Sequence, residues 1–281
     1  MEHNTKLLSI FVFKKRRQTA LVANTIYNIT SMKTIRCELC AYSVEACRTA
    51  ARLGVDRVEL CASPTEGGVT PSIAVIEQVS AIEGIDVSVM IRPRGGDFLY
   101  SDDELQTMLR DIAHARETGV TGVVIGLLTA DGRVDIERTQ MLVEAASGME
   151  TTFHRAVDMT ADYPQAIEDI IATGCTRILT SGGHDKATDG IDAIAQAVTI
   201  AAGRIEIMAG SGVAANNALQ LAATGIDALH FSAKRIVAGG MKYRNPRISM
   251  GGTESVDEFA LRTVDTDEVK AIIQRIKTRV S

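Results

Sequence analysis

The chain has 281 residues and a hydrophobic content of 46%, so it is long enough to bury one large core or two small ones. Its formal net charge is -5 and the charges are spread along the sequence, which gives no basis for binding a nucleic acid or an anionic membrane. Only 4% of the residues are aromatic and tryptophan is absent, so platforms for stacking bases are not expected either.

The first 31 residues differ in composition from the rest. An apolar run, Leu7–Phe13, is too short to cross a bilayer, and the basic cluster Lys14–Arg17 follows it, whereas a secretory signal places its charges first. We expect residues 1–31 to be a disordered extension, with an organelle transit peptide or a start at Met32 as alternatives. Residues 32–281 are expected to form the folded domain, which ends in a C-terminal helix.

Five cysteines are present, an odd number that gives no disulfide framework and fits a reducing compartment. They are Cys37, Cys40, Cys47, Cys61 and Cys175. The spacing Cys37-x-x-Cys40 also allows a zinc or redox motif. Side chains three residues apart in a strand point to opposite faces, however, which argues against that interpretation.

Short β-branched runs alternate with longer stretches of helical periodicity from Ile35 onward. The expected strands are Ile35–Cys40, Arg57–Cys61, Val87–Ile91, Gly122–Gly126, Thr151–His154, Arg177–Thr180, Ile205–Ala209 and Ala228–Ser232. The expected helices are Val44–Leu53, Ile73–Ile82, Asp103–Thr118, Asp135–Ala146, Pro164–Thr173, Asp189–Ala202 and Asn216–Thr224. Glycine follows four of these helices, where a left-handed C-cap is favoured, at positions 54, 119, 174 and 225.

Eight strand and helix units without a second composition regime predict a single α/β domain, a (β/α)₈ TIM barrel. A doubly wound open sheet is the alternative, because strand order cannot be read from spacing. In a TIM barrel the active site is built at the C-terminal ends of the strands. We expect the N-terminal ends of these strands to carry no comparable group of polar residues.

Two pentapeptides repeat each other 21 residues apart, Arg36-Cys37-Glu38-Leu39-Cys40 and Arg57-Val58-Glu59-Leu60-Cys61. Alternate residues of a strand share a face, so Glu38 points with Cys40 and Glu59 with Cys61. On neighbouring parallel strands the two thiols would meet at the mouth of the barrel with two carboxyls beneath them. Thiolates are soft ligands that suit Cu(I), although free cysteine also packs as a small hydrophobic residue.

Other charged residues gather where the strands end. They are Arg92, Arg94, Asp97, His154, Arg155 and Asp158. Arg92 and Arg94 are the expected partners of Glu38 and Glu59, either as structural ion pairs or around an acid/base pair. His154 is placed where a general acid/base or a metal ligand would lie, with a structural role as the alternative.

Two glycine-containing loops follow the sixth and seventh strands. They are Ser181-Gly182-Gly183 and Gly210-Ser211-Gly212. Loops of this kind expose backbone N–H groups that can hold a phosphate or another anion, and these strands are the usual place for such a site in a TIM barrel. Ser181, Gly182, Gly210, Ser211 and Gly212 are therefore candidate anion-binding residues.

Longer motifs are more specific than any of these loops. They are Glu38-Leu39-Cys40, Arg57-Val58-Glu59-Leu60-Cys61, Glu66-Gly67-Gly68-Val69-Thr70-Pro71-Ser72, Ile91-Arg92-Pro93-Arg94-Gly95-Gly96-Asp97-Phe98-Leu99-Tyr100-Ser101, Thr152-Phe153-His154-Arg155-Ala156, Leu179-Thr180-Ser181-Gly182 and Met241-Lys242-Tyr243-Arg244-Asn245. This set resembles the CutC copper-homeostasis family. The resemblance implies a cytoplasmic, oligomeric TIM barrel with a Cu(I) site at Cys40 and Cys61. No accepted reaction accompanies the family name, although its members look built like enzymes.

Two functional hypotheses follow, and a barrel that serves mainly as an assembly partner is a third. The first is a copper homeostasis protein that binds Cu(I) through the thiolates of Cys40 and Cys61 at the barrel mouth. The second is an aldolase-like or isomerase-like enzyme acting on a small anionic substrate, phosphorylated substrates included. In that enzyme Arg92 or Arg94 would clamp the anion, a glutamate would move a proton and His154 would assist the reacting oxygen.

Overall fold

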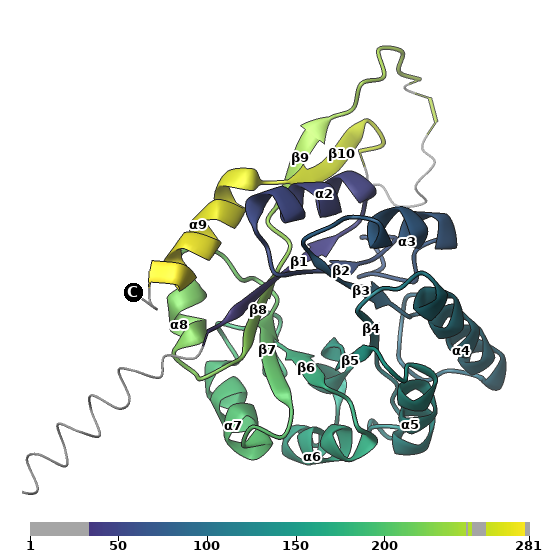
Figure 1. Ribbon diagram of the computed structural model, residues 1–281, viewed down its shortest axis with the longest axis vertical. Coiled ribbons are helices and arrows are strands. Elements are labelled where there is room, and N and C mark those ends of the chain that lie inside the picture. The colour runs from purple at the N-terminus through teal and green to yellow at the C-terminus, as the bar shows by residue number, and fades with distance from the viewer. Residues whose placement is uncertain (1–33, 246, 249–256, 279–281) are drawn as a thin grey trace, which may run out of the picture. The chain divides into compact units, whose positions relative to one another are not determined.

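The computed structural model describes residues 34–245, 247–248 and 257–278, so the expected extension 1–31 lies outside the described residues. Eight parallel strands close into a barrel in chain order, from β1 beside β2 around to β8 beside β1 (Figure 1). The (β/α)₈ barrel is therefore confirmed and the open sheet is excluded.

The strands are β1 Arg36–Ala41, β2 Arg57–Leu60, β3 Asp86–Met90, β4 Gly122–Ile125, β5 Glu150–Phe153, β6 Arg177–Thr180, β7 Glu206–Gly210 and β8 Ala228–Phe231. The helices that cover them are α2 Val44–Leu53, α3 Ile73–Ser80, α4 Asp102–Glu117, α5 Ile136–Ala145, α6 Tyr163–Thr173, α7 Ile191–Ala201 and α8 Ala218–Ala222. Helix α8 is shorter than the expected Asn216–Thr224, because Asn217 accepts a hydrogen bond from the Ala214 amide and holds the preceding residues in a turn.

Helix ends follow the expected chemistry. Ser43 caps α2 by accepting a hydrogen bond from the Ala46 amide, and Gly54 ends the same helix in the left-handed region at φ 73°. Ser101 and Glu104 form a reciprocal capping box at the start of α4. These local signals determine where α2 begins and ends and where α4 begins.

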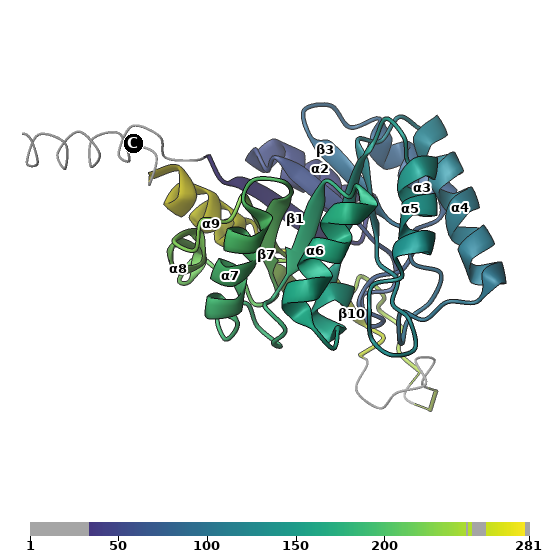
Figure 2. The ribbon, with the colours of Figure 1, turned by 90° about the horizontal axis from the view of Figure 1, so that it is seen from below.

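The sequence analysis did not predict three of the described elements, and it gave no bounds for a fourth. A 3₁₀ helix, η1 Arg155–Met159, follows β5, and an antiparallel hairpin of β9 Lys234–Ala238 and β10 Ala260–Val264 follows β8. The expected C-terminal helix is α9 Thr266–Thr278, which lies beside α8 in both views (Figures 1 and 2). None of the helices described is both long and apolar enough to span a bilayer.

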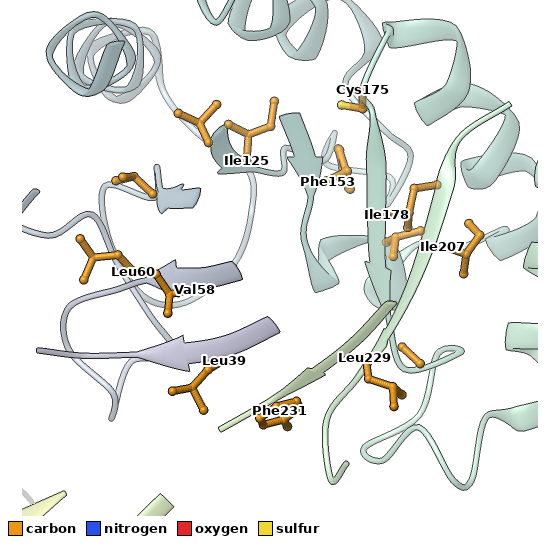
Figure 3. Packing of buried hydrophobic residues seen from close by; sticks show 14 of the residues in the cluster. Leu39, Val58, Leu60, Ile125, Phe153, Cys175, Ile178, Ile207, Leu229 and Phe231 are labelled. Carbon is orange, nitrogen blue, oxygen red and sulfur yellow. The ribbon is translucent and has the colours of Figure 1, made fainter. Parts of the chain in front are cut away.

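Alternate residues of each strand divide the core in two. Leu39, Val58, Ile178 and Ile207 are fully buried on the outer face of the barrel, where they pack beneath the helices (Figure 3). Cys37 shares this outer core, whereas Cys40 lies in a separate cluster inside the barrel. The two cysteines of the Cys37-x-x-Cys40 motif thus lie on opposite faces of β1 and do not form one metal or redox site.

The N-terminal ends of the strands carry a dense group of charges, contrary to the expectation from the sequence. Arg57 and Arg177 are buried inside the barrel. Arg57 pairs with Glu38 and lies 3.7 Å from Glu150, while Arg177 pairs with Glu150 at 2.8 Å and with Glu206 at 2.7 Å. Five strands, β1, β2, β5, β6 and β7, supply these residues, so the group, here called the arginine floor, links strands on both sides of the lower end of the barrel. The arginine floor could not be predicted from the sequence pattern, because an arginine at the start of a strand is equally compatible with an exposed position.

Replacing Arg57 with alanine is expected to lower the free energy of unfolding by about 3–5 kcal/mol, because it leaves the buried Glu38 carboxylate without its nearest cation. Urea denaturation measures this change. Arg52→Ala is the matched control, since Arg52 pairs with Glu45 on the surface and should unfold like the unaltered protein. Equal stabilities of the two variants would contradict the structural role of the floor.

Candidate metal and small-molecule site

Three neighbouring strands bring a thiol, a carboxyl and an imidazole together at the C-terminal mouth of the barrel. Cys40 on β1 lies opposite Glu59 on β2, and Glu38 on β1 lies opposite His230 on β8. One ligand atom from each of Cys40, Glu59 and His230 lies within 4.8 Å of the other two. Glu59 is buried, whereas Cys40 and His230 are partly buried. Parallel pairing thus places side chains from both ends of the chain around one point.

Cys61 joins this group from the residue that follows β2. Its thiol donates a hydrogen bond to Glu59 Oε2 at 3.4 Å and is also hydrogen bonded to Cys40. Tyr42 contributes a further hydrogen bond to Cys40 from the loop after β1. The two sulfurs of the repeated Glu-Leu-Cys motif therefore lie side by side at the mouth, with Glu59 beneath them.

The sequence analysis missed His230, and it assigned Glu38 the wrong partners. His230 Nδ1 lies 2.7 Å from Glu38 Oε1, and its Nε2 lies 3.7 Å from Glu59 Oε2. Glu38 pairs with His230 and Arg57, not with the expected arginines of the third strand. Alternation along β8 was the available signal, because His230 lies two residues before Ser232 and both side chains line the cavity.

The buried charges set the ionisation of this group. Burial would raise the pKa of Glu38, but hydrogen bonds and charges from His230 and Arg57 lower it to about 2. Burial would lower the pKa of His230, but the Glu59 and Glu38 carboxyls and a hydrogen bond to Cys40 raise it well above its usual value. Burial raises the pKa of Glu59 to about 8, and the neighbouring charges of Cys40 and Glu38 act in the same direction.

The surroundings of Cys40 favour the thiolate form of its side chain. A hydrogen bond from Cys61 and another from His230 lower the pKa of Cys40 well below the usual value for a thiol, although burial opposes them. The hydrogen bond to Cys40 and burial together raise the pKa of Cys61. These shifts favour a thiolate at Cys40, an imidazolium at His230, a thiol at Cys61 and a protonated carboxyl at Glu59.

A cavity of about 520 Å³ opens above this cluster. It is lined by Cys40, Tyr42, Glu59, Glu66, Gly67, Met90, Arg92, Phe98, His154, Arg155, Leu179, Ser211, Gly212, Val213, His230, Phe231, Ser232 and Lys234. Of the residues predicted for the site, the cavity gathers Cys40, Glu59, Arg92, His154 and Arg155, together with Ser211 and Gly212. Its walls come from strands on both sides of the barrel, so it extends well beyond the thiols.

His154 forms part of the cavity wall at the end of β5 and remains neutral. Burial, assisted by the charge of Arg92, lowers its pKa to about 3. Its Nδ1 accepts a hydrogen bond from the Ala156 amide at 3.1 Å, so the ring hydrogen resides on Nε2. Nε2 has no hydrogen-bond partner among the described residues, and neither has Glu59 Oε1.

Arg92 and Arg94, which follow β3, both hydrogen bond to loop residues, and of the two only Arg92 lines the cavity. Arg92 donates to the carbonyl oxygens of Glu66, Gly68 and Gly96, which joins the loops that follow β2 and β3. Arg94 instead pairs with Glu104 at 2.6 Å and with Asp97 at 3.1 Å. The side chain of Asp97 is 74% exposed, and neither Arg94 nor Asp97 lines the cavity.

Asp158 fills one of the two loops expected to bind an anion. Its carboxylate accepts hydrogen bonds from the amides of Ser181 and Gly183 at 2.9 and 3.0 Å, and it pairs with Arg155 at 2.9 Å. Arg155 also donates to the Ser181 hydroxyl. An internal carboxylate thus takes the position that an anion would need beside Ser181 and Gly182, whereas Ser211 and Gly212 of the second loop face the cavity.

Iodoacetamide at pH 7 is expected to alkylate Cys40 first, because only this thiol has a lowered pKa. Burial raises the pKa of Cys37 and Cys47 to about 12 and of Cys175 to about 11. His230→Gln should slow labelling of Cys40 roughly tenfold, since the imidazolium that stabilises its thiolate is lost. Timed peptide mapping by mass spectrometry measures both rates, and faster labelling of any other cysteine would contradict this assignment.

Comparison with known proteins shows the family and the fold. The sequence profile of the CutC family matches residues 35–235. A family protein CutC from Bacteroides thetaiotaomicron is 46% identical over 249 residues, 88% of this chain and 100% of the relative. A crystal structure described as a candidate copper homeostasis protein CutC from Streptococcus agalactiae is 38% identical, with a TM-score of 0.66, over 70% of this chain and 97% of that one. An aldolase structure that is 16% identical, with a TM-score of 0.55, over 70% of this chain and 89% of that one shares the fold alone. The chain belongs to the CutC family.

Proposed function

We propose that this protein binds Cu(I) as cargo at the barrel mouth, through the sulfurs of Cys40 and Cys61. The observation that carries the proposal is the pair of adjacent sulfurs, one of them already favoured as a thiolate by its surroundings. Cu(I) prefers soft thiolate ligands and accepts low coordination numbers. The description of the Streptococcus agalactiae relative as a candidate copper homeostasis protein points in the same direction.

The residues around the sulfurs fit this cargo. Cys61 would give up its proton when the metal binds, as coordinating thiols do, and the raised pKa of Glu59 keeps that carboxyl from adding a second negative charge. Glu38 holds the His230 ring at Nδ1 and so fixes the direction of Nε2. Glu59 and His230 are also ligand types that zinc accepts, so zinc is the competing metal to test.

Anaerobic titration with Cu(I) against a competing chelator should give one ion per chain, and Cys40→Ser combined with Cys61→Ser should abolish it. Either single change should weaken binding by at least tenfold, because one sulfur remains. Cys37→Ala is the matched control, since Cys37 belongs to the outer core and should leave binding unchanged. Undiminished binding by the double variant would rule out this site, and tighter binding of Zn²⁺ than of Cu(I) would reassign its metal.

An aldolase-like or isomerase-like enzyme is the second candidate, and the cavity favours it. Its volume of about 520 Å³ suits a small molecule, and two buried polar atoms beside it, Glu59 Oε1 and His154 Nε2, have no partner among the described residues. Glu59 would move a proton, His154 would donate to a substrate oxygen, and Arg155 would contact the anionic end. This second candidate function gives no catalytic role to Arg94, Asp97 or Asp158, because their contacts are structural.

A thermal-shift screen of phosphosugars and keto acids tests this second function. A true ligand should raise the melting temperature of the unaltered protein, and His154→Ala should remove most of the rise because the oxygen loses its donor. Lys242→Gln, a surface change outside the cavity, should keep it. A panel without a stabilising compound, together with tight Cu(I) binding, would leave copper as the function.

A further inference from the structure

The cavity is far larger than a metal ion needs. Each water in the liquid occupies about 30 Å³, so a space of about 520 Å³ accommodates an organic molecule above the sulfurs. The space is lined on opposite sides of the barrel, from His230 on β8 to His154 after β5. A small ligand can therefore reach Cys40, which lines the cavity and is hydrogen bonded to the buried Cys61, while the walls leave little room for a folded protein domain.

Two cations without a described carboxylate partner flank the sulfurs. Around the barrel the strands run β8, β1, β2 and β3. Lys234 follows β8, Cys40 lies near the C-terminal end of β1, Cys61 follows β2 and Arg92 follows β3. The hydrogen bonds of Arg92 go to carbonyl oxygens, which leave its charge uncompensated. Lys234 is exposed, lines the cavity and has no described ion-pair partner.

The remaining charges around the cavity do not reverse this sign. Arg155 is balanced by Asp158, and Glu66 is the acidic residue of the wall besides Glu59. His230 is paired with Glu38 at 2.7 Å, so it is not counted as a free charge of the cavity wall. A ligand with negative charge is therefore favoured here, although the chain as a whole carries a net charge of -5.

We propose that the cavity receives a small anionic thiol, which carries Cu(I) to Cys40 and Cys61 while its carboxylates lie near Lys234 and Arg92. This inference rests on the proposed copper function and names the partner of that same site. Cu(I) in water must arrive bound to a ligand, and a soft ligand small enough for this cavity is a thiol. The flanking cations select the members of that class that carry negative charge.

The transfer is a ligand exchange without a change of oxidation state. The Cys40 thiolate forms a bond to the copper of a bis-thiolate complex, and one donor thiolate leaves. The Cys61 sulfur then forms the second bond as the other donor thiolate leaves and takes the Cys61 proton. Two copper–sulfur bonds form, two break, and the products are the loaded protein, one free thiolate and one free thiol.

Stopped-flow absorbance under anaerobic conditions tests the inference with two donors, the Cu(I) complexes of mercaptosuccinate and of the neutral 2-mercaptoethanol. At low salt the mercaptosuccinate complex should load the protein at least about fivefold faster, because its carboxylates meet Lys234 and Arg92 at close range. High salt should remove most of this advantage. Equal rates from the two donors would overturn the inference.

Substitutions at two lysines distinguish the effect of the Lys234 charge at the cavity from the effect of the net charge of the protein. Lys234→Gln should reduce the advantage of mercaptosuccinate to less than about twofold, and Lys234→Glu should abolish it. Lys242→Gln removes the same charge outside the cavity and should keep the advantage. Equilibrium binding of Cu(I) should stay within about twofold in all three variants, because their sulfurs are intact. Identical behaviour of Lys234→Gln and Lys242→Gln would contradict the assignment.

Metal-free protein provides an independent readout. (Methylthio)succinate has the two carboxylates but no free thiol, and calorimetry should detect its binding to the unaltered protein and a loss of at least fivefold in affinity in Lys234→Glu. Normal Cu(I) affinity without discrimination between the donors, or without (methylthio)succinate binding, would reject the thiol partner alone. Absence of Cu(I) binding by the unaltered protein would reject the copper function and, with it, this inference.

Discussion

One buried carboxylate, that of Glu38, connects the two ends of the barrel interior. Arg57 of the arginine floor lies on one side of it and His230 of the mouth on the other, and the side chain is only 1% exposed. A carboxylate at such a depth is tolerated because both of its oxygens are paired. The same pairing keeps His230 charged and directed, so the ionisation of Cys40 depends on a contact that begins below it.

The mouth of the barrel brings soft sulfur ligands and hard oxygen and nitrogen atoms together around one cavity. Cys40 and Cys61 offer sulfur, while Glu59 and His154 present polar atoms that no described residue satisfies. Unsatisfied buried groups are costly in a stable core, so their presence around a cavity is typical of a binding site. The proposed copper cargo would account for the two sulfurs, and a proposed organic ligand would account for the unsatisfied polar atoms of the wall.

Local patterns were enough to predict the barrel, because each strand start, helix cap and left-handed glycine is determined by nearby residues. The same holds for the meeting of Cys40 and Cys61, which needs only the alternation of a strand and the adjacency of β1 and β2. The partners of Glu38 could not be found this way, since Arg57 and His230 depend on the register of three strands around a closed barrel. The filling of the loop beside Ser181 by Asp158 depends on tertiary contacts that spacing does not encode.

The arginine floor closes the interior at the end away from the thiols, with Arg57 and Arg177 completely buried. The interior of the barrel is therefore accessible only from its C-terminal mouth. A ligand that enters the cavity must leave through the same opening before the next ligand can bind. Binding and release therefore alternate, and no ligand passes through the barrel from one end to the other.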